Sequence, residues 1–257
     1  MGVILCIETA TEVCSVALSR DENLLGIKES SVRNVHSAML TVFIGEIMKE
    51  SGTGYTELDA VAVSMGPGSY TGLRIGVATA KGLCYALDKP LIAIPTLQSM
   101  AIGINYELKI KNYEKSNDNP HIVTNIPHPA SRIPYMICPM IDARRMEVYC
   151  AVYDQNLTEV LETKAEIVDE SSFSELLSKQ FIVFGGDGAE KCKPILEHHE
   201  NAIFMEGFHA SARHMTGFAE KKLKQNQFEN LAYFEPFYLK DFIAGKARVK
   251  GLNEIAK

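Results

Sequence analysis

Two short segments of this 257-residue sequence carry residue types that could bind a nucleotide. Each combines hydroxyls or glycine amides, which bind phosphate oxygens, with a carboxylate, which positions Mg²⁺ or a water molecule. The candidate residues are Glu8, Thr9 and Thr11 in IETATEVCS and Gly185, Gly186 and Asp187 in VFGGDGAEK. A tight strand-to-helix turn that needs no ligand is the alternative interpretation of the second segment.

The glycine-rich segment 64–83, SMGPGSYTGLRIGVATAKGL, fits neither common phosphate-binding motif. A Walker A loop ends in Gly-Lys-Ser/Thr, but here Gly72 is followed by Leu73. A dinucleotide-binding turn needs Gly-x-Gly-x-x-Gly, and Thr71 stands where the third glycine belongs. Asp88 lies at a suitable distance for a ribose contact, so a dinucleotide-binding oxidoreductase stays open as one alternative.

The elements that would position these residues occur twice along the chain. Strand-like segments at 3–9, 13–20 and 24–30 form one meander, and those at 135–142, 146–154 and 157–164 form another. An acidic residue closes the first strand of each meander, Glu8 and then Asp142. Helix and strand patterns alternate after both, at 35–50, 59–65, 69–87 and 91–95, then at 171–179, 181–184, 188–198, 201–205 and 210–225.

This repetition predicts an α/β fold of two tandem ribonuclease-H-like units, the architecture of actin, Hsp70 and the sugar kinases. We expect an N-terminal unit over residues 1–104 and a C-terminal unit with a C-terminal tail over 135–257. The segment 105–134 is rich in Asn, Ser, Pro and charged residues and lacks periodicity. It is therefore expected to be a surface insertion between the units.

Both hairpins that would hold ATP between such units lack the glycine that lets backbone amides approach phosphates. Ala10 follows Glu8 and Thr9 in the first hairpin, and Ala143 follows Asp142 in the second. We therefore expect no catalytic residues for phosphoryl transfer and no required cofactor. Weak binding of ATP or ADP stays open. A catalytically active small-molecule kinase or acyltransferase of the same fold is the main alternative function, although both alanines argue against it.

Two helices of the first unit have surfaces that indicate a partner protein. Small residues recur at Gly72, Gly76 and Ala80, so one helix carries a stripe that another backbone can approach closely. The preceding helix is apolar over more than the single stripe that a surface helix needs, so the surplus meets either the neighbouring helix or another protein. The predicted interface comprises His36, Met39, Leu40, Phe43, Ile47, Tyr70, Gly72, Leu73, Gly76, Val77 and Ala80. Leucine at position 76 should then abolish pairing and leave the monomer folded, unless the stripe packs within the chain.

The composition limits the classes of partner and location. The net charge of −6 argues against nucleic-acid binding by this chain alone, because such affinity depends mainly on cationic groups facing phosphates. The six cysteines form no CxxC pair and are expected to be buried, reduced thiols. The sequence shows no signal-peptide pattern and no apolar run of about 18 residues, so we expect a cytoplasmic protein without a membrane segment.

Four segments together resemble the bacterial TsaB family of tRNA threonylcarbamoyladenosine biosynthesis proteins. They are ILCIETATEVCSVAL, GPGSYTGLRIGVATAKGL, MIDARRMEVY and EPFYLKDF, and the resemblance covers nearly the whole chain except 105–134. It implies a non-catalytic member of the actin-like ATPase superfamily that pairs with and activates the catalytic paralogue TsaD. In that family, TsaD transfers a threonylcarbamoyl group to N6 of adenosine 37 in tRNAs that read ANN codons.

The resemblance also implies further partners and a missing metal site. TsaE, an ATPase, joins the complex, tRNA is contacted indirectly through the complex, and the two helices described above form the surface that pairs with TsaD. Self-pairing through the same helices in the absence of TsaD stays open. TsaD holds its catalytic metal on an H-x-x-x-H pattern. This sequence has Thr96 and Met100 at the corresponding places, so no metal is expected.

Overall fold

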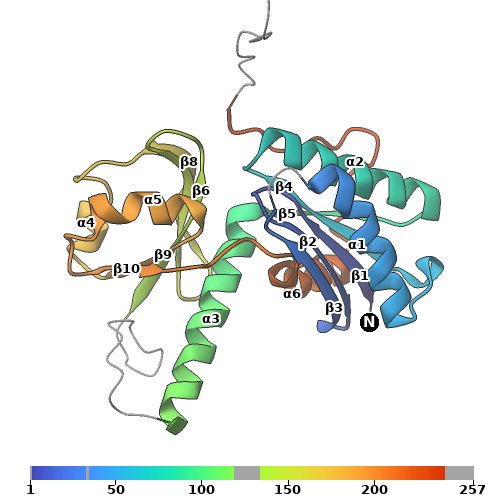
Figure 1. Ribbon diagram of the computed structural model, residues 1–257, viewed down its shortest axis with the longest axis horizontal. Coiled ribbons are helices and arrows are strands. Elements are labelled where there is room, and N and C mark those ends of the chain that lie inside the picture. Colours follow the sequence, from blue (N-terminus) through green and yellow to red (C-terminus); the bar gives the residue numbers. More distant parts are fainter. Residues whose placement is uncertain (1, 33–34, 119–133, 241–257) are drawn as a thin grey trace, which may run out of the picture.

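The computed structural model describes residues 2–32, 35–118 and 134–240, which form two α/β units side by side (Figure 1). The first sheet comprises β1 (Val3–Glu8), β2 (Cys14–Arg20), β3 (Asn23–Ser30), β4 (Ala60–Gly66) and β5 (Leu91–Pro95). The second comprises β6 (Tyr135–Asp142), β7 (Glu147–Asp154), β8 (Glu159–Ile167), β9 (Phe181–Gly185) and β10 (Ala202–Met205).

The two sheets share one topology. Their strand orders are β3-β2-β1-β4-β5 and β8-β7-β6-β9-β10, so each strand of the first sheet has a counterpart in the second. In each sheet the first three strands pair antiparallel as a meander, and the last two join parallel to the first strand. This arrangement confirms the predicted pair of tandem ribonuclease-H-like units.

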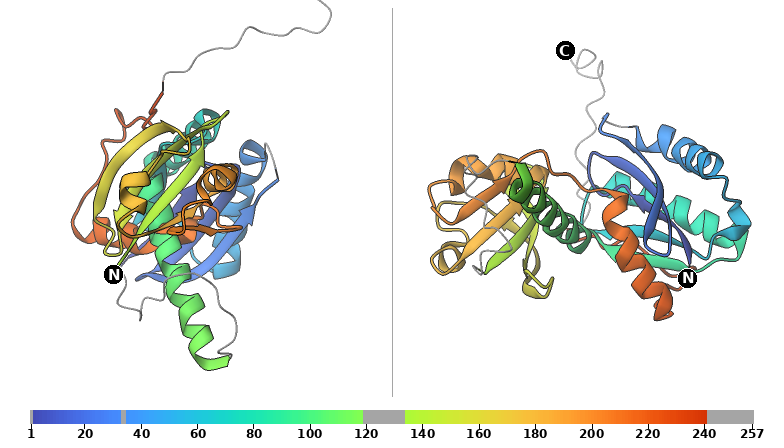
Figure 2. Two further views of the ribbon diagram at one scale, coloured as in Figure 1. Left: turned by 90° about the vertical axis from the view of Figure 1, so that its left-hand side faces the viewer. Right: turned by 90° about the horizontal axis from the view of Figure 1, so that it is seen from below.

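Helices cover both faces of the first sheet, which explains why β1 is apolar along nearly its whole length and buried at every residue. On one face lie α1 (His36–Ser51) and α2 (Tyr70–Leu87), and between them in sequence come the short 3₁₀ helix η1 (Tyr55–Glu57) and β4. On the other face lie the 3₁₀ helix η2 (Ala212–Met215) and α6 (Thr216–Lys224), as the view from below shows (Figure 2).

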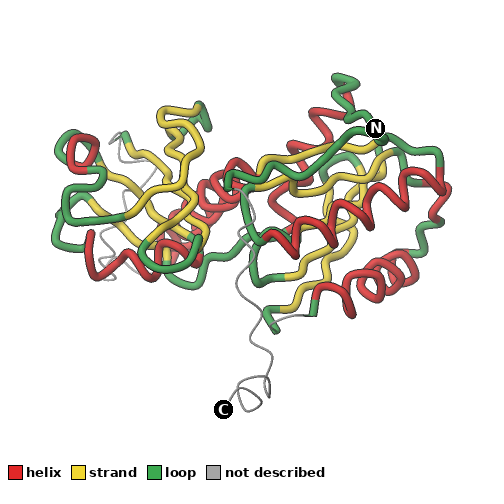
Figure 3. The backbone as a smooth tube through the Cα atoms, turned by 90° about the horizontal axis from the view of Figure 1, so that it is seen from above, coloured by secondary structure: helices red, strands yellow, loops and turns green. Residues whose placement is uncertain are grey.

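The second sheet is covered by α4 (Ser174–Leu177) and α5 (Asp187–Leu196) on one face and by α3 (Thr96–Asp118) on the other. The tube view shows the two sheets with their helices (Figure 3), and the long α3 lies at the junction of the units in Figure 1. Each unit therefore takes one covering helix from the other half of the chain: α3 follows the first sheet in sequence, and α6 follows the second.

This exchange corrects the unit boundaries expected from the sequence. The chain from 96 packs on the second sheet instead of belonging to a unit 1–104, and the chain from 211 to 240 returns to the first sheet instead of staying in the unit 135–257. Sequence order alone assigned these segments to the nearer meander. The structure assigns them by the apolar face that each one covers.

The insertion expected over 105–134 is also wrong at its start. Helix α3 continues to Asp118, and Ile104, Asn105 and Leu108 are buried against the second unit. The Tyr135 hydroxyl donates a hydrogen bond of 2.7 Å to the side-chain oxygen of Asn105, which satisfies this polar residue. The pattern after the strand at 91–95 predicts only a short helix, and the length of α3 was missed because its later turns are polar and charged. Residues 119–133, with His121 and His128, lie outside the described residues.

The C-terminal segment runs along α2 in the opposite direction. Glu229 forms a bridge with Leu91 beyond the end of the helix, and the Lys81 ammonium donates to the carbonyls of Ala232 and Phe234. The amide of Phe237 donates to the carbonyl of Met65 at 2.7 Å, beside the start of α2. No helix among the described residues has the length and apolar character needed to span a bilayer.

Candidate functional site

The glycine-rich turn between β4 and α2 packs against the β1–β2 hairpin of the same chain. The hydroxyl of Ser69 caps α2 by accepting a hydrogen bond of 3.3 Å from the amide of Gly72. The amide of Ser69 donates to the carbonyl of Ala10 at 2.6 Å, and the Thr9 hydroxyl donates to the carbonyl of Gly72 at 2.9 Å. The amide and hydroxyl groups closest to the hairpin therefore make hydrogen bonds within the chain.

The small-residue stripe of α2 makes room for this hairpin. A Cβ atom on Gly72 would lie 2.0 Å from the carbonyl oxygen of Thr9, and one on Gly76 would lie 2.2 Å from the Thr9 hydroxyl. A side chain at either position would force the hairpin to shift, at Gly72 through its backbone and at Gly76 through the Thr9 side chain. The expectation that leucine at Gly76 would leave the monomer folded is therefore wrong, because the stripe faces the chain's own hairpin.

Most residues of the predicted interface are likewise buried in the core of the first unit. These residues are His36, Leu40, Phe43, Ile47, Gly72, Leu73, Gly76, Val77 and Ala80. The buried apolar residues of α1 pack against both the sheet and α2. Only Met39 and Tyr70 of the predicted set keep part of their side chains at the surface.

The two helices present a different set of small and apolar residues to solvent. This outward face comprises Ala38, Val42 and Gly45 on α1 and Ala78, Gly82 and Tyr85 on α2. A Cβ atom on Gly45 or on Gly82 would meet no atom within 4 Å, and Val42 is 43% exposed. Tyr85, at 84%, is the most exposed large apolar residue of the described chain. The outward face therefore lacks bulky side chains at Gly45 and Gly82, and exposed charged residues flank it, with Arg74 one turn before Ala78 and Lys49 one turn after Gly45.

The first group of candidate nucleotide-binding residues is buried in the β1–β2 hairpin. Glu8 is fully buried, and burial raises the pKa of its carboxyl to about 7. One oxygen of Glu8 accepts the amide hydrogen of Ala10 at 2.7 Å, and the Thr11 hydroxyl accepts that of Val13 at 3.3 Å. The other oxygen of Glu8 has no hydrogen-bond partner among the described residues. These side chains hold the hairpin in shape.

The second group forms the turn from β9 to α5, and its glycines admit neighbouring parts of the chain. A Cβ atom on Gly185 would lie 2.8 Å from the side chain of Ile104. Gly186 adopts a φ of +112°, and a Cβ atom there would lie 2.2 Å from the carbonyl of Met140. The structure therefore gives both glycines a packing role.

Asp187 completes this turn and links it to the β6–β7 hairpin. Its carboxylate accepts the amide hydrogens of Asp142 at 3.1 Å and of Gly188 at 2.9 Å. Burial raises its pKa, and the nearby carboxylates of Asp142 and Glu12 raise it further. Because Glu12 belongs to the first hairpin, the hairpins of the two units lie within electrostatic reach of each other.

Comparison with known proteins relates the chain to tRNA threonylcarbamoyladenosine biosynthesis. A family model described as TsaD, tRNA N6-adenosine threonylcarbamoyltransferase, matches residues 13–123. The tRNA threonylcarbamoyladenosine biosynthesis protein TsaB of Escherichia coli (strain K12) is 30% identical over 252 residues, which cover 95% of this chain and 96% of that protein. The chain belongs to the TsaB family.

Other relatives agree with this assignment. The TsaB protein of Bacillus subtilis (strain 168) is 27% identical over 150 residues, 58% of this chain and 54% of that protein. The structure titled "YeaZ from Pseudomonas aeruginosa" superposes with a TM-score of 0.70 at 21% identity, and covers 93% of this chain and 100% of its own. The match to this solved structure supports the fold. The two-unit architecture of this TsaB-family chain is thus shared along its length.

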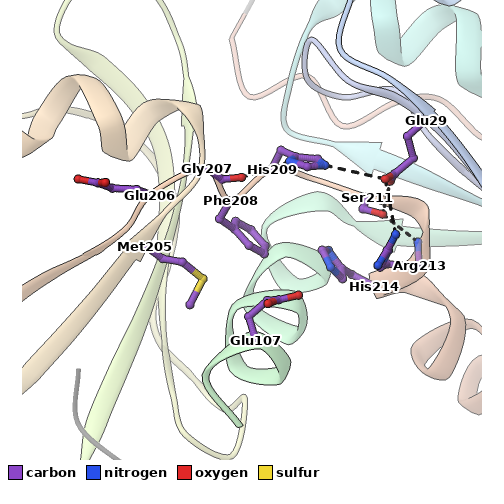
Figure 4. Close-up of a pocket in the computed structure, with 10 residues that line it drawn as sticks. All are labelled: Glu29, Glu107, Met205, Glu206, Gly207, Phe208, His209, Ser211, Arg213 and His214. Carbon is purple, nitrogen blue, oxygen red and sulfur yellow. Dashed lines mark hydrogen bonds and ion pairs between the residues drawn. The ribbon is translucent and has the colours of Figure 1, made fainter. Parts of the chain in front are cut away.

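The TsaB-family chain also contains a polar cluster that sequence reasoning missed, at the junction of its units (Figure 4). Glu29 of β3 accepts hydrogen bonds from Ser211 at 2.5 Å and Ser15 at 2.9 Å, and Arg213 lies 3.7 Å away. The imidazole of His209 lies 4.0 Å from the same carboxylate. Glu29 and Ser211 are too distant in sequence for any local pattern to have paired them.

This cluster fixes the return of the chain to the first unit. Burial raises the pKa of Glu29, but the nearby imidazole of His209, the hydrogen bonds from Ser211 and Ser15 and the charge of Arg213 lower it to about 2. The carboxylate is therefore ionised at neutral pH, and it accepts hydrogen bonds from two serine hydroxyls. Its surroundings form a cavity of about 230 Å³ between the β3 edge and the segment 205–214.

The residues at the places of the TsaD metal ligands serve the fold of this TsaB-family chain. The Thr96 hydroxyl accepts a hydrogen bond of 3.1 Å from the amide of Gly66, and Met100 is buried between α3 and the second sheet. Among the residues that the structure describes, no three His, Cys, Asp or Glu side chains are grouped closely enough to hold a metal ion.

Proposed function

We propose that this chain is the non-catalytic subunit that pairs with and activates a TsaD relative in forming N6-threonylcarbamoyladenosine at position 37 of tRNAs that read ANN codons. The similarity to the E. coli TsaB protein over nearly the full length supports this role. The structural observation that carries the pairing is the outward face of α1 and α2, which is small, apolar and open to solvent.

The outward face is suited to a pair of helices from another protein. Small residues at its centre, Gly45, Ala78 and Gly82, let a partner helix approach closely, and Val42 supplies apolar contact. The opposite sides of α1 and α2 are anchored in the core, so the face is rigid before binding. Tyr85 at its edge is the kind of exposed aromatic residue that anchors protein interfaces.

Light scattering after gel filtration tests this pairing directly. The chain is run alone and after mixing with the TsaD relative from the same cell. We expect a stable 1:1 species that forms at the expense of the free chain, and increased threonylcarbamoyl transfer to tRNA in its presence. Failure to associate at micromolar concentrations would overturn the proposal.

A matched pair of glycine variants tests the surface itself. Gly82 and Gly217 both lie in helices, and a Cβ atom on either would meet no atom within 4 Å, but Gly217 belongs to α6, on the other face of the sheet. Leucine should strengthen either helix by about 1 kcal/mol. We expect Gly82→Leu to weaken pairing at least tenfold and Gly217→Leu to leave it unchanged. Equal affinities would place the interface elsewhere.

The remaining partners follow from the same proposal. TsaE joins the TsaD pair, tRNA is contacted through the complex, and the chain works in the cytoplasm without a cofactor of its own. In the absence of TsaD, the outward face is free to pair with a second copy, so Gly82→Leu should also convert any homodimer to monomer. Equilibrium dialysis with ATP and ADP tests the cofactor statement. Tight binding by the chain alone would contradict it.

A further inference from the structure

A cavity of about 320 Å³ lies where β4 and β5 end, between the first sheet and the β7–β8 hairpin of the second unit. Its size falls within the range of small-molecule sites, about 300–1,000 Å³. In open α/β sheets, the carboxyl ends of parallel strands are where ligands generally bind. This cavity is separate from the outward face and from the two nucleotide-binding candidates.

The walls of the cavity are flat and apolar. Pro67 and Pro95 lie at the ends of the two parallel strands, Tyr153 comes from β7, and Phe237 comes from the C-terminal segment. Proline rings and aromatic rings present broad apolar faces, which favour a planar ring stacked against them. A flexible aliphatic chain would use such surfaces less completely.

The walls are also held in place before any ligand arrives. Gly66 adopts a φ of +115°, and a Cβ atom there would lie 2.5 Å from the carbonyl of Phe237. The amide of Phe237 donates to the carbonyl of Met65 at 2.7 Å, and that of Gly66 donates to the Thr96 hydroxyl at 3.1 Å. A preformed cavity costs a ligand little ordering free energy.

The polar groups in the lining define the charge of the ligand. Gln98 offers an amide that makes no hydrogen bond within the described part of the chain. Glu159 contributes a carboxylate, one oxygen of which accepts the amide hydrogen of Thr163 at 3.2 Å. The described lining includes no Lys, Arg or His side chain, so nothing there would neutralise a phosphate.

We propose that this cavity binds an uncharged nitrogen heterocycle, a nucleobase or a nucleoside without phosphate, stacked between its flat walls and hydrogen-bonded to the amide of Gln98. A glutamine amide presents one donor and one acceptor together and so matches the paired donor and acceptor on the edge of a base. The proposal is independent of pairing with TsaD, because none of the lining residues belongs to the outward face.

Calorimetry and ligand-observed NMR with adenine, adenosine and AMP test the proposal on the full chain. We expect saturable 1:1 binding of adenosine, with AMP at least tenfold weaker because the carboxylate of Glu159 repels its phosphate. Absence of saturable binding by adenine and adenosine at millimolar concentrations would overturn the proposal. Tighter binding of AMP than of adenosine would also overturn it, since it would indicate a phosphate site.

Three variants assign the binding to this cavity. Gln98→Leu should weaken adenosine binding at least tenfold, whereas Gln225→Leu, at the exposed end of α6, should leave it unchanged. Glu159→Lys should make AMP bind more tightly than adenosine, because the new ammonium group attracts the phosphate. All three should still pair with the TsaD relative, which shows that they are folded. Unchanged adenosine affinity in a folded Gln98→Leu chain would contradict the assignment.

Discussion

Glycines of helix α2 have opposite roles within a few residues of one another. Gly76 faces inward, where the hydroxyl of Thr9 occupies the space that a side chain would need. Gly82 faces solvent, and nothing in the described chain requires the absence of a side chain there. A glycine in a helix costs about 1 kcal/mol relative to alanine. At Gly76 that cost makes room for Thr9 of the same chain. At Gly82, in our proposal, it makes room for a partner helix.

Alanine at each of these two positions should therefore change stability in opposite directions. We expect Gly76→Ala to lower the free energy of unfolding by about 1–3 kcal/mol, because its Cβ would displace Thr9 and strain the hairpin. Gly82→Ala should raise it by about 1 kcal/mol through helix propensity. Urea unfolding of both variants measures the difference. A neutral Gly76→Ala would mean that the hairpin can move away from α2.

Glu8 should make the stability of the protein depend on pH. Its pKa is about 7 in the folded chain, against an ordinary value of 4.5, so the folded state binds the proton more tightly. Stability is therefore unaffected below about pH 4.5 and falls as the pH rises from there to about 7. Glu8→Gln should remove this loss, which is on the order of 3 kcal/mol.

Urea unfolding at pH 5 and pH 8 checks the role of Glu8. The stability difference between Glu8→Gln and the natural chain should grow in favour of the variant at the higher pH. Glu162→Gln, an exposed position on β8, is the control and should show no such trend. A constant difference at both pH values would show that Glu8 is already ionised in the folded chain.

The helices and strands illustrate which part of a structure a sequence pattern predicts. The predicted range 69–87 and the observed α2, Tyr70–Leu87, differ by one residue at the start, because Ser69 caps the helix and Asp88 ends it. The direction of the small-residue stripe was wrong. Periodicity shows that one side of α2 differs from the rest, but it cannot show whether that side meets Thr9 or a partner.

The return segment should depend on the Glu29 cluster for its attachment. The pKa of Glu29 is about 2 in the folded chain, below its ordinary value of 4.5, so its stabilisation is present above about pH 4.5 and lost as the pH falls towards 2. At neutral pH, Glu29→Gln should cost on the order of 2 kcal/mol. Hydrogen exchange of the peptide 206–214 should become faster in the variant.

Glu206→Gln provides the matched control for this element. Glu206 pairs with Lys193 beside the same cavity, but the Glu206 side chain is 73% exposed and that of Lys193 39%, so the loss should be below about 1 kcal/mol. Exchange of the peptide 206–214 should stay close to that of the natural chain. Equal effects of the two variants would show that the Glu29 cluster does not fasten the connection.

At the scale of the whole molecule, the repeated meander predicted two sheets of the same topology, and the structure confirms them. It did not predict that α3 and α6 are exchanged between the units. Each helix carries apolar residues that could cover either sheet, and sequence distance favours the wrong one. Only the shapes of the apolar faces, which form after each sheet is assembled, decide between the two arrangements.

The exchange predicts that the first half of the chain is not stable alone. In a fragment of residues 1–118, the face of the first sheet that α6 covers would lie bare, with Ile4, Cys6, Ile92 and Ile94 in water. We expect this fragment to bind a hydrophobic dye and to unfold without a cooperative transition. A soluble fragment with a sharp thermal transition would contradict this expectation.

The same exchange sets an order of events during synthesis. Roughly 120 residues separate Pro95, where the first sheet ends, from Thr216, where α6 begins. At about 5–20 residues per second, a ribosome needs about 6–24 s to make that stretch. For that interval the growing chain carries an apolar surface that α6 has not yet covered, so we expect the nascent protein to depend on shielding by the ribosome or by a chaperone until α6 emerges.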